Sequence, residues 1–198
     1  MATTEKLLEA FALFDEANVQ DPNIELYNDK SYPKEVLYSI RMTDKLNEFL
    51  PEASEALQLA ARCQHIRRWE IARDSYPMDR VGYLKWRQDL KKFHASEASI
   101  ILQSIGYNDT IISEVSSLLQ KKHLKKNPDT QALEDVICLV FLEFYFEPFA
   151  AKHSDEKTID IIQKTWRKMS KKGHNAALKL PLSQDSLALI QSALKDIS

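Results

Sequence analysis

Apolar residues recur mainly at intervals of three and four residues along this chain, and no segment shows several consecutive apolar–polar alternations bounded by turns. Because that spacing is the period of an amphipathic helix, the pattern predicts an almost entirely α-helical protein of about eight helices. Asp79 is a candidate N-cap for the fourth helix, Gly106 would terminate that helix, and Asn108 or Asp109 begins the fifth. The expected helices cover residues 4–17, 34–49, 51–69, 79–104, 108–122, 128–149, 156–169 and 184–197.

The interior of the sixth expected helix, residues 136–149, is the most apolar stretch of the chain. We therefore expect it to be the central buried helix. No internal repeat, low-complexity tract or shift of composition divides the sequence. A length of 198 residues suits one domain, so the sequence predicts a single helical domain over residues 1–198.

Composition excludes several classes of protein. Only three glycines are present, which disfavours β-sandwiches and propellers with their many tight turns. The glycine-rich motifs of classical dinucleotide folds and P-loops are missing. The 27 basic and 29 acidic side chains nearly cancel, to a net charge of -2, so the whole surface is not that of a general nucleic-acid coat. Any anion-binding surface must be local.

Targeting signals and reactive cysteines are not evident in the sequence. Cys63 and Cys138 lie within apolar helical patterns without a CxxC neighbour, which indicates buried thiols in a reducing compartment. The amino terminus resembles neither a signal peptide nor a transit peptide. The longest apolar stretch is shorter than a membrane span and is interrupted by Glu143 and Glu147. We expect a soluble, cytoplasmic protein with no membrane partner.

Four metal-capable side chains continue the apolar stripe of an expected helix at four-residue steps: His65, His94, His123 and Asp135. They are expected to point inward. An inward carboxylate is costly unless a cation, a metal or donated hydrogen bonds compensate it, and imidazoles with a carboxylate commonly bind zinc, manganese or iron. The alternatives are that each histidine is an ordinary core residue, and that Asp135 favours the dipole of its own helix from the first turn.

The order and spacing of these four residues resemble the HD-domain superfamily of helical, metal-dependent phosphohydrolases. Within it, the blocks CQHIRRWEI, SYPMDRVGYLKWR, LKKFHASEASIIL and LEDVICLVFLEFYF are similar to a smaller family known as a domain of unknown function. The resemblance extends from FDEANVQDPN to KMSKKGHNAALKLPL, nearly the whole chain. It implies an HD-like helical bundle.

The resemblance also implies roles for individual residues. His65 and His94 would be histidine ligands and Asp135 the closing aspartate of a site for a divalent ion (Zn, Mn, Fe or Mg), while His123 would bind a second metal or a phosphate. The chain departs from the motif after His94, where Ala95 replaces the aspartate that ligates the metal and helps to activate water. Glu97, three residues after His94, could supply a carboxylate or be a solvated surface residue.

Cations are concentrated beside these residues. Residues 62–92 contain nine Lys and Arg against four Asp and Glu. Guanidinium groups bind phosphate oxygens in pairs, and nearby aromatic rings could stack on a base. The alternative for the lysines is a solvated helix face. The predicted phosphate-binding residues are Arg68, Arg73, Arg80, Arg87, Lys122 and His123.

Two functions follow as hypotheses. The first is a metal-dependent phosphohydrolase for a nucleotide or another small phosphorylated molecule, with catalysis by the metal ligands and, as a candidate, Glu97. The second is a module that binds a nucleotide or an RNA end without turnover, which Ala95 favours. A helical scaffold for a protein partner is a third possibility.

Overall fold

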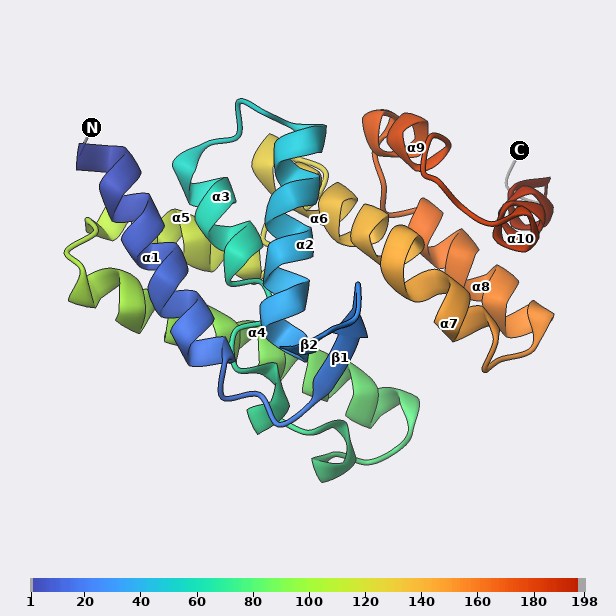
Figure 1. Ribbon diagram of the computed structural model, residues 1–198, viewed down its shortest axis with the longest axis horizontal. Helices are drawn as coiled ribbons and strands as arrows, with labels where there is room; N and C mark the ends of the chain where they lie inside the picture. Colours follow the sequence, from blue (N-terminus) through green and yellow to red (C-terminus); the bar gives the residue numbers. More distant parts are fainter. Residues whose placement is uncertain (1, 196–198) are drawn as a thin grey trace. The chain divides into compact units, whose positions relative to one another are not determined.

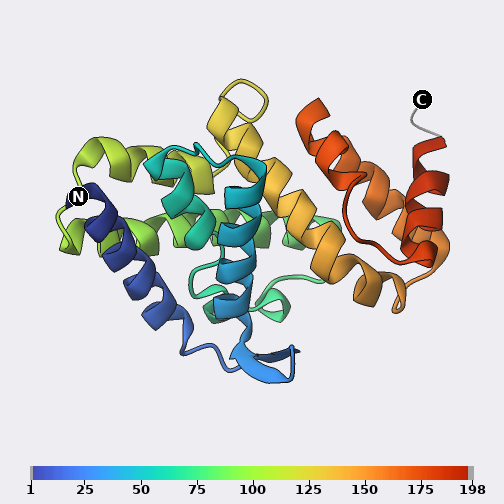
Figure 2. The ribbon, with the colours of Figure 1, turned by 45° about the horizontal axis from the view of Figure 1, so that its top comes forward.

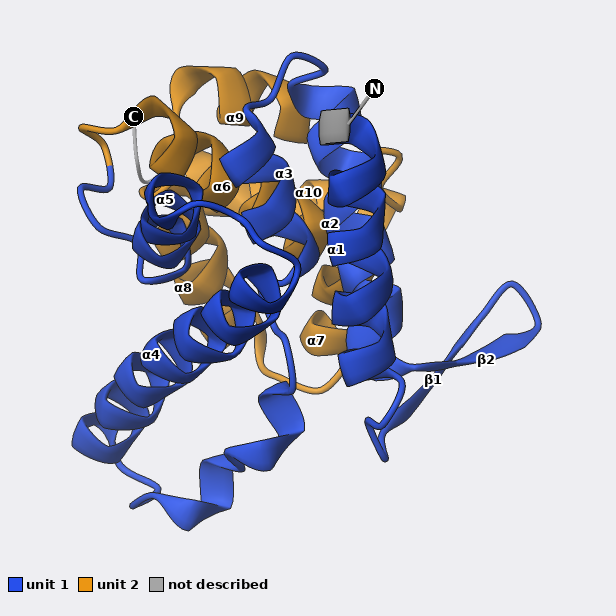
Figure 3. Ribbon diagram, turned by 90° about the vertical axis from the view of Figure 1, so that its left-hand side faces the viewer, with its two compact units in different colours: residues 1–124 blue, residues 125–198 orange. Residues whose placement is uncertain are grey.

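A computed structural model describes residues 2–195 of the chain (Figure 1). The chain forms two compact units, residues 1–124 and residues 125–198, which Figure 3 shows in different colours. The described residues contain ten α-helices and one two-stranded sheet, so the protein is mostly helical, as predicted. The expected end of the last helix at residue 197 lies outside the described residues. None of the described helices combines the length and hydropathy that a membrane span requires.

Unit 1 is built from five α-helices and a hairpin, with two short 3-10 turns before α4. Helix α3 packs against α2 and α5, α4 packs along α5, and α1 lies against α3 and α4. The core contains Phe14, Met42, Leu57 and Leu102, all fully buried. The elements are α1 (Ala2–Asn18), β1 (Ile24–Tyr27), β2 (Lys30–Pro33), α2 (Lys34–Phe49), α3 (Glu55–Arg62), the 3-10 turns Arg68–Glu70 and Arg73–Ser75, α4 (Arg80–Ser104) and α5 (Asp109–Leu119).

Unit 2 consists of five further helices, of which α8 packs against α10 and α6 against α9. Its apolar core includes Leu133, Val136, Leu139, Phe146 and Ile162, none more than 1% exposed. The elements are α6 (Pro128–Val140), a π-helical segment (Phe141–Tyr145), α7 (Phe146–Ala150), α8 (Asp155–Trp166), α9 (Lys171–Ala177) and α10 (Gln184–Lys195).

The prediction of about eight helices is wrong by two among the described residues. The sixth expected helix is divided by the π-helical segment into α6 and α7, and α9 is a seven-residue helix that the periodicity did not indicate. Both differences have a local cause. A π-turn leaves the chain helical, so the apolar pattern continues across it, whereas seven residues are too few for a clear period.

The hairpin of β1 and β2 was also not predicted. Its antiparallel register pairs Ile24 with Pro33 and Tyr27 with Lys30, and Figures 2 and 3 show it projecting from the helices of unit 1. Asn28 and Asp29 form the turn with φ of 49° and 60°, as a type I′ turn requires. The strands are four residues long and mostly exposed, so they carry no alternation of buried and exposed positions that a sequence pattern could reveal.

The third helix is shorter than predicted. It was expected to cover residues 51–69, but α3 begins after its N-cap Ser54 and ends at Arg62. The chain then turns through residues 63–67, where Arg67 adopts a left-handed φ of 51° and donates its backbone N–H to Asn18 Oδ1 at 2.9 Å. His65 therefore lies in a turn after α3 instead of on the helix.

Candidate functional site

His94 is a buried residue in the middle of α4. The helix begins at its N-cap Asp79, whose Oδ1 accepts the N–H of Gly82 at 2.7 Å, and His94 continues the buried line of Leu90 and Ala98. The residue is only 3% exposed. Its burial therefore agrees with the apolar stripe of the sequence.

The hydrogen bonding of His94 leaves one ring nitrogen available. Nδ1 lies 2.7 Å from the carbonyl oxygen of Ile66 and donates to it, because a carbonyl can only accept. Burial, followed by the neighbouring His65, lowers the pKa of His94 to about 3, so the ring is neutral at pH 7. Nε2 then carries a lone pair, and this buried atom has no hydrogen-bond partner.

His65 lies beside His94, with the two ring centroids 6.0 Å apart. Its ring stacks on Tyr38 of α2 at a centroid distance of 4.1 Å and an angle of 11°. Burial lowers the pKa of His65 well below its usual value, and nearby positive charges lower it further, those of Arg68, Arg87, Lys121 and Lys34. This imidazole is therefore neutral at pH 7. Its side chain keeps 23% of its surface exposed, so it can be reached from solvent.

Glu35 of α2 is a member of this cluster that the sequence analysis missed. Its Oε2 lies 3.2 Å from Nδ1 of His65, and the residue is 5% exposed. Burial raises the pKa of Glu35 to about 7, against the positive charges of Arg68 and Lys34. The sequence did contain a signal, because Glu35 starts a buried line on α2 with Tyr38 and Met42, the same pattern that singled out the histidines.

Arg68 and Trp86 form a wall next to these residues. The Arg68 guanidinium lies 4.9 Å from the centroid of the Trp86 ring, and its Nε is 4.0 Å from Oε1 of Glu35. The indole N–H of Trp86 donates to the carbonyl of Ile71 at 2.9 Å, which fixes the ring. Glu35, Tyr38, His65, Arg68, Trp86 and His94 are called the imidazole cluster below.

The other three predicted arginines have different surroundings. Arg87 is half-buried, donates to the hydroxyl of Tyr83 at 3.1 Å, and its charge acts on His65. Arg73 donates to backbone carbonyls of its own loop, including that of Pro77 at 2.8 Å. Arg80 is exposed at the start of α4. Of the four, Arg68 and Arg87 are among the main charges that lower the pKa of His65.

Glu97 lies one turn after His94 on α4 and forms an ion pair with Arg67. Its Oε2 lies 2.5 Å from Nη1 of Arg67, which also binds Glu70. Ala95, which replaces the motif's aspartate, is 3% exposed. The paired carboxylate thus links α4 to the turn that carries His65.

Lys122 and His123 lie in the turn after α5, and both are exposed. The expectation that His123 points inward from the end of a helix is wrong, because α5 ends at Leu119. Lys121 takes a left-handed φ of 56°, and the N–H of Lys122 bonds to the carbonyl of Ser117 at 3.0 Å. This closing turn releases the chain from the helical stripe before His123.

Asp135 belongs to unit 2, where hydrogen bonds from its own unit satisfy it. It is 2% exposed; its Oδ1 accepts the backbone N–H of Ser170 at 2.7 Å and Nε2 of Gln131 at 3.2 Å, and its Oδ2 accepts the Ser170 hydroxyl at 2.5 Å. A Cβ at Gly173 would lie only 2.5 Å from Oδ1. Asp135 therefore anchors the N-terminal end of α9.

The interpretation of Asp135 as a first-turn residue of its own helix is wrong, because α6 begins at Pro128, two turns earlier. Its predicted place beside His65 and His94 stays a prediction. Among residues 2–195, no group of three or more His, Cys, Asp or Glu side chains is arranged to hold a metal ion. Within unit 1, the chemistry available is that of two neutral imidazoles, a buried carboxyl group and a set of cations.

Comparison with known families gives one match. The family described as "Domain of unknown function (DUF4202)" matches residues 8–190. Neither the curated proteins nor the solved structures contain a match to the chain. Since the match covers nearly all of the sequence, including both units and the whole imidazole cluster, this protein belongs to the DUF4202 family.

Proposed function

We propose that the imidazole cluster is the centre of a metal-dependent phosphohydrolase for a nucleotide or another small phosphorylated molecule. The observation that carries this proposal is that Nε2 of His94 has no hydrogen-bond partner although the residue is buried, with only 3% of its surface exposed. A buried polar atom without a partner costs free energy, and binding of a ligand there recovers it. The resemblance of the sequence to the HD-domain superfamily supports the same chemistry.

The donor chemistry fits a transition-metal ion. Both imidazoles are neutral, which a metal ligand requires, and the carbonyl of Ile66 fixes the tautomer of His94 with Nε2 free. His65 and His94 would supply two of the three protein ligands usual in catalytic sites. Glu35, in contact with His65, is the candidate third ligand within unit 1. A bound divalent ion would lower the pKa of a water molecule and neutralise charge on the phosphoryl group.

The surrounding residues suit a phosphate. Four cations lower the pKa of His65 through their charge: Arg68, Arg87, Lys121 and Lys34. The same positive potential attracts an anion. Trp86 holds Arg68 by stacking, so the guanidinium edge can donate to phosphate oxygens. In this proposal Arg68 and Arg87 orient the phosphoryl group.

Metal content and hydrolysis test the proposal together. Protein purified without chelator is expected to carry about one divalent ion per chain by elemental analysis, and to hydrolyse p-nitrophenyl phosphate or nucleotides. His94→Ala should remove both properties. His153→Ala is the matched control, because His153 stacks on Phe149 and lies in unit 2. Metal content and hydrolysis that persist in His94→Ala, or a wild-type chain without either in the presence of added Zn²⁺, Mn²⁺, Fe²⁺ and Mg²⁺, would refute it.

A second candidate function is binding of a nucleotide or RNA end without turnover. Ala95 favours it, because the superfamily's aspartate is missing there, and the carboxylate of Glu97 is already paired with Arg67. This function predicts saturable nucleotide binding that needs Arg68, with no hydrolysis and no bound metal. Equilibrium dialysis with labelled nucleotide, run beside the hydrolysis assay, separates the two functions.

A further inference from the structure

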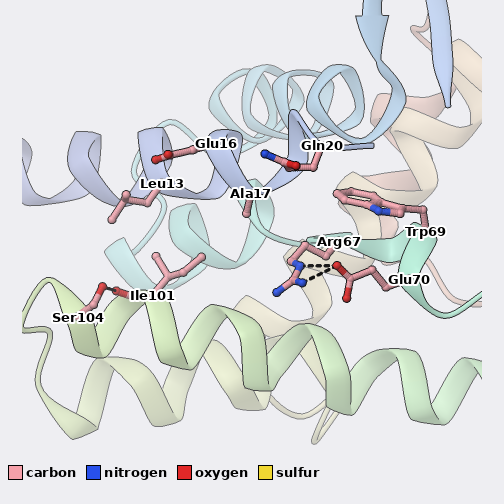
Figure 4. Close-up of a pocket in the computed structure, with 9 residues that line it drawn as sticks. All are labelled: Leu13, Glu16, Ala17, Gln20, Arg67, Trp69, Glu70, Ile101 and Ser104. Atoms are coloured by element: carbon pink, nitrogen blue, oxygen red, sulfur yellow. Dashed lines mark hydrogen bonds and ion pairs between the residues drawn. The ribbon is translucent and has the colours of Figure 1, made fainter. Parts of the chain in front are cut away.

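A second feature of unit 1 is a cavity of about 540 Å³ between α1 and α4, with the turn at residues 67–70 at one end (Figure 4). Its volume is in the range of small-molecule sites. No residue of the imidazole cluster lines it. The lining residues are Leu13, Glu16, Ala17, Gln20, Arg67, Trp69, Glu70, Ile101 and Ser104.

Apolar groups form one part of this cavity. Leu13 and Ala17 come from α1, Ile101 faces them from α4, and the indole of Trp69 stands near the other end (Figure 4). These surfaces can cover an aliphatic stem of a few carbons. The flat indole face is also the strongest aromatic partner for a cation.

The charged groups give the cavity a surplus of negative charge. Arg67 is the one cation in the lining, and Glu70 and Glu97 both bind its guanidinium. Two carboxylates therefore share one positive charge. Glu16, which is exposed on α1, adds a further negative charge across the cavity from Glu70 (Figure 4).

We propose that this cavity binds an organic cation, a protonated amine or guanidinium on a short aliphatic stem. The stem lies against Leu13 and Ile101, and the charged end lies beside Glu70 near the face of Trp69, while Glu16 adds negative charge at the Leu13 end (Figure 4). This site goes beyond the proposed phosphohydrolase, whose cationic surroundings select the opposite charge. A phosphate would be repelled here, because Arg67 is already neutralised.

Ligand-detected and protein-detected NMR on the full chain tests the proposal with agmatine, butylamine and butanol. The amines are expected to bind saturably in the millimolar range or tighter, and butanol, which has the same stem without the charge, at least about threefold more weakly. Raising the salt concentration should weaken the amines only. An acetylated, amidated lysine, as a model of a partner's side chain, distinguishes a free small molecule from a peptide as the source of the cation.

Two variants locate the site. Glu16→Gln removes one charge and should weaken agmatine by about two- to fivefold, and Trp69→Leu should weaken it by a similar or larger factor. Glu5→Gln is the control, since Glu5 is an exposed acid on the same helix that does not line the cavity. Equal affinity for butanol and butylamine, or unchanged agmatine binding in Glu16→Gln and Trp69→Leu, overturns the proposal. Hydrolysis by the imidazole cluster does not enter these readouts.

Discussion

Two buried polar centres in this protein differ in how their hydrogen bonds are satisfied. Both oxygens of Asp135 in unit 2 accept hydrogen bonds, from Ser170 and Gln131. In the imidazole cluster of unit 1, by contrast, Nε2 of His94 and Oε2 of Glu35 are buried without a hydrogen-bond partner. A satisfied buried group holds structure together, whereas an unsatisfied one stores free energy that a ligand can recover. The contrast therefore separates an anchoring residue from candidate binding residues.

Asp135→Ala is expected to have the largest effect on stability. It removes three hydrogen bonds and leaves the N–H and hydroxyl of Ser170 without their acceptor, a loss of about 4 kcal/mol in the free energy of unfolding. Urea denaturation followed by circular dichroism measures it. Asp160→Ala, which breaks only the exposed pair with Lys164, should change stability little. A loss below about 1 kcal/mol for Asp135→Ala would contradict the role of Asp135 as an anchoring residue.

Glu35→Gln should change how stability depends on pH. The pKa of Glu35 is raised from 4.5 to about 7 in the folded chain, so the folded state prefers the protonated form. Its stabilising contribution is present below pH 4.5 and is lost as pH rises through 7. Glutamine cannot ionise, so the variant should gain about 3 kcal/mol over the wild type between pH 4 and pH 8. Parallel stability curves for the two proteins over that range would contradict the burial of this carboxyl group.

His94→Leu tests whether His94 is a binding residue or a residue that stabilises the core. Leucine suits the buried stripe of Leu90 and Ala98 and loses only the bond to the carbonyl of Ile66, so we expect a cost of about 1 kcal/mol in unfolding free energy. Metal content and hydrolysis should nevertheless disappear. A destabilisation as large as that of Asp135→Ala would instead make His94 a core residue, as the alternative interpretation of the sequence held.

Glu97→Gln should have the smallest effect. The pair with Arg67 is partly exposed, with 39% of the arginine side chain and 19% of the glutamate side chain accessible, so its loss should cost less than about 1 kcal/mol. Thermal unfolding measures this cost. Elemental analysis of the same variant adds a second readout, because a fall in metal content would indicate that Glu97 is a metal ligand together with the histidines.

Several features of the fold could be predicted from local sequence. Asp79 is an N-cap, as expected, because its side chain accepts a backbone N–H group three residues ahead, and the fifth helix begins at Asp109, one of its two expected starts. Burial of His94 followed from its position on the stripe of Leu90 and Ala98. His65 and His123 were placed on helices, but α3 ends at Arg62 and α5 at Leu119. The left-handed residues in the turns that follow, Arg67 and Lys121, are not glycines, so the sequence does not indicate these turns.

The sequence by itself determined the helical class, the buried line of α4 and the concentration of cations near His65, because these depend on residues a few positions apart. Only the tertiary structure decided which polar groups meet. Glu35 reaches His65 because α2 packs against α3, and Asp135 reaches Ser170 because α6 packs against α9. Such partners are separated by 30 or more residues, and helical periodicity fixes the face of each helix without fixing its neighbour.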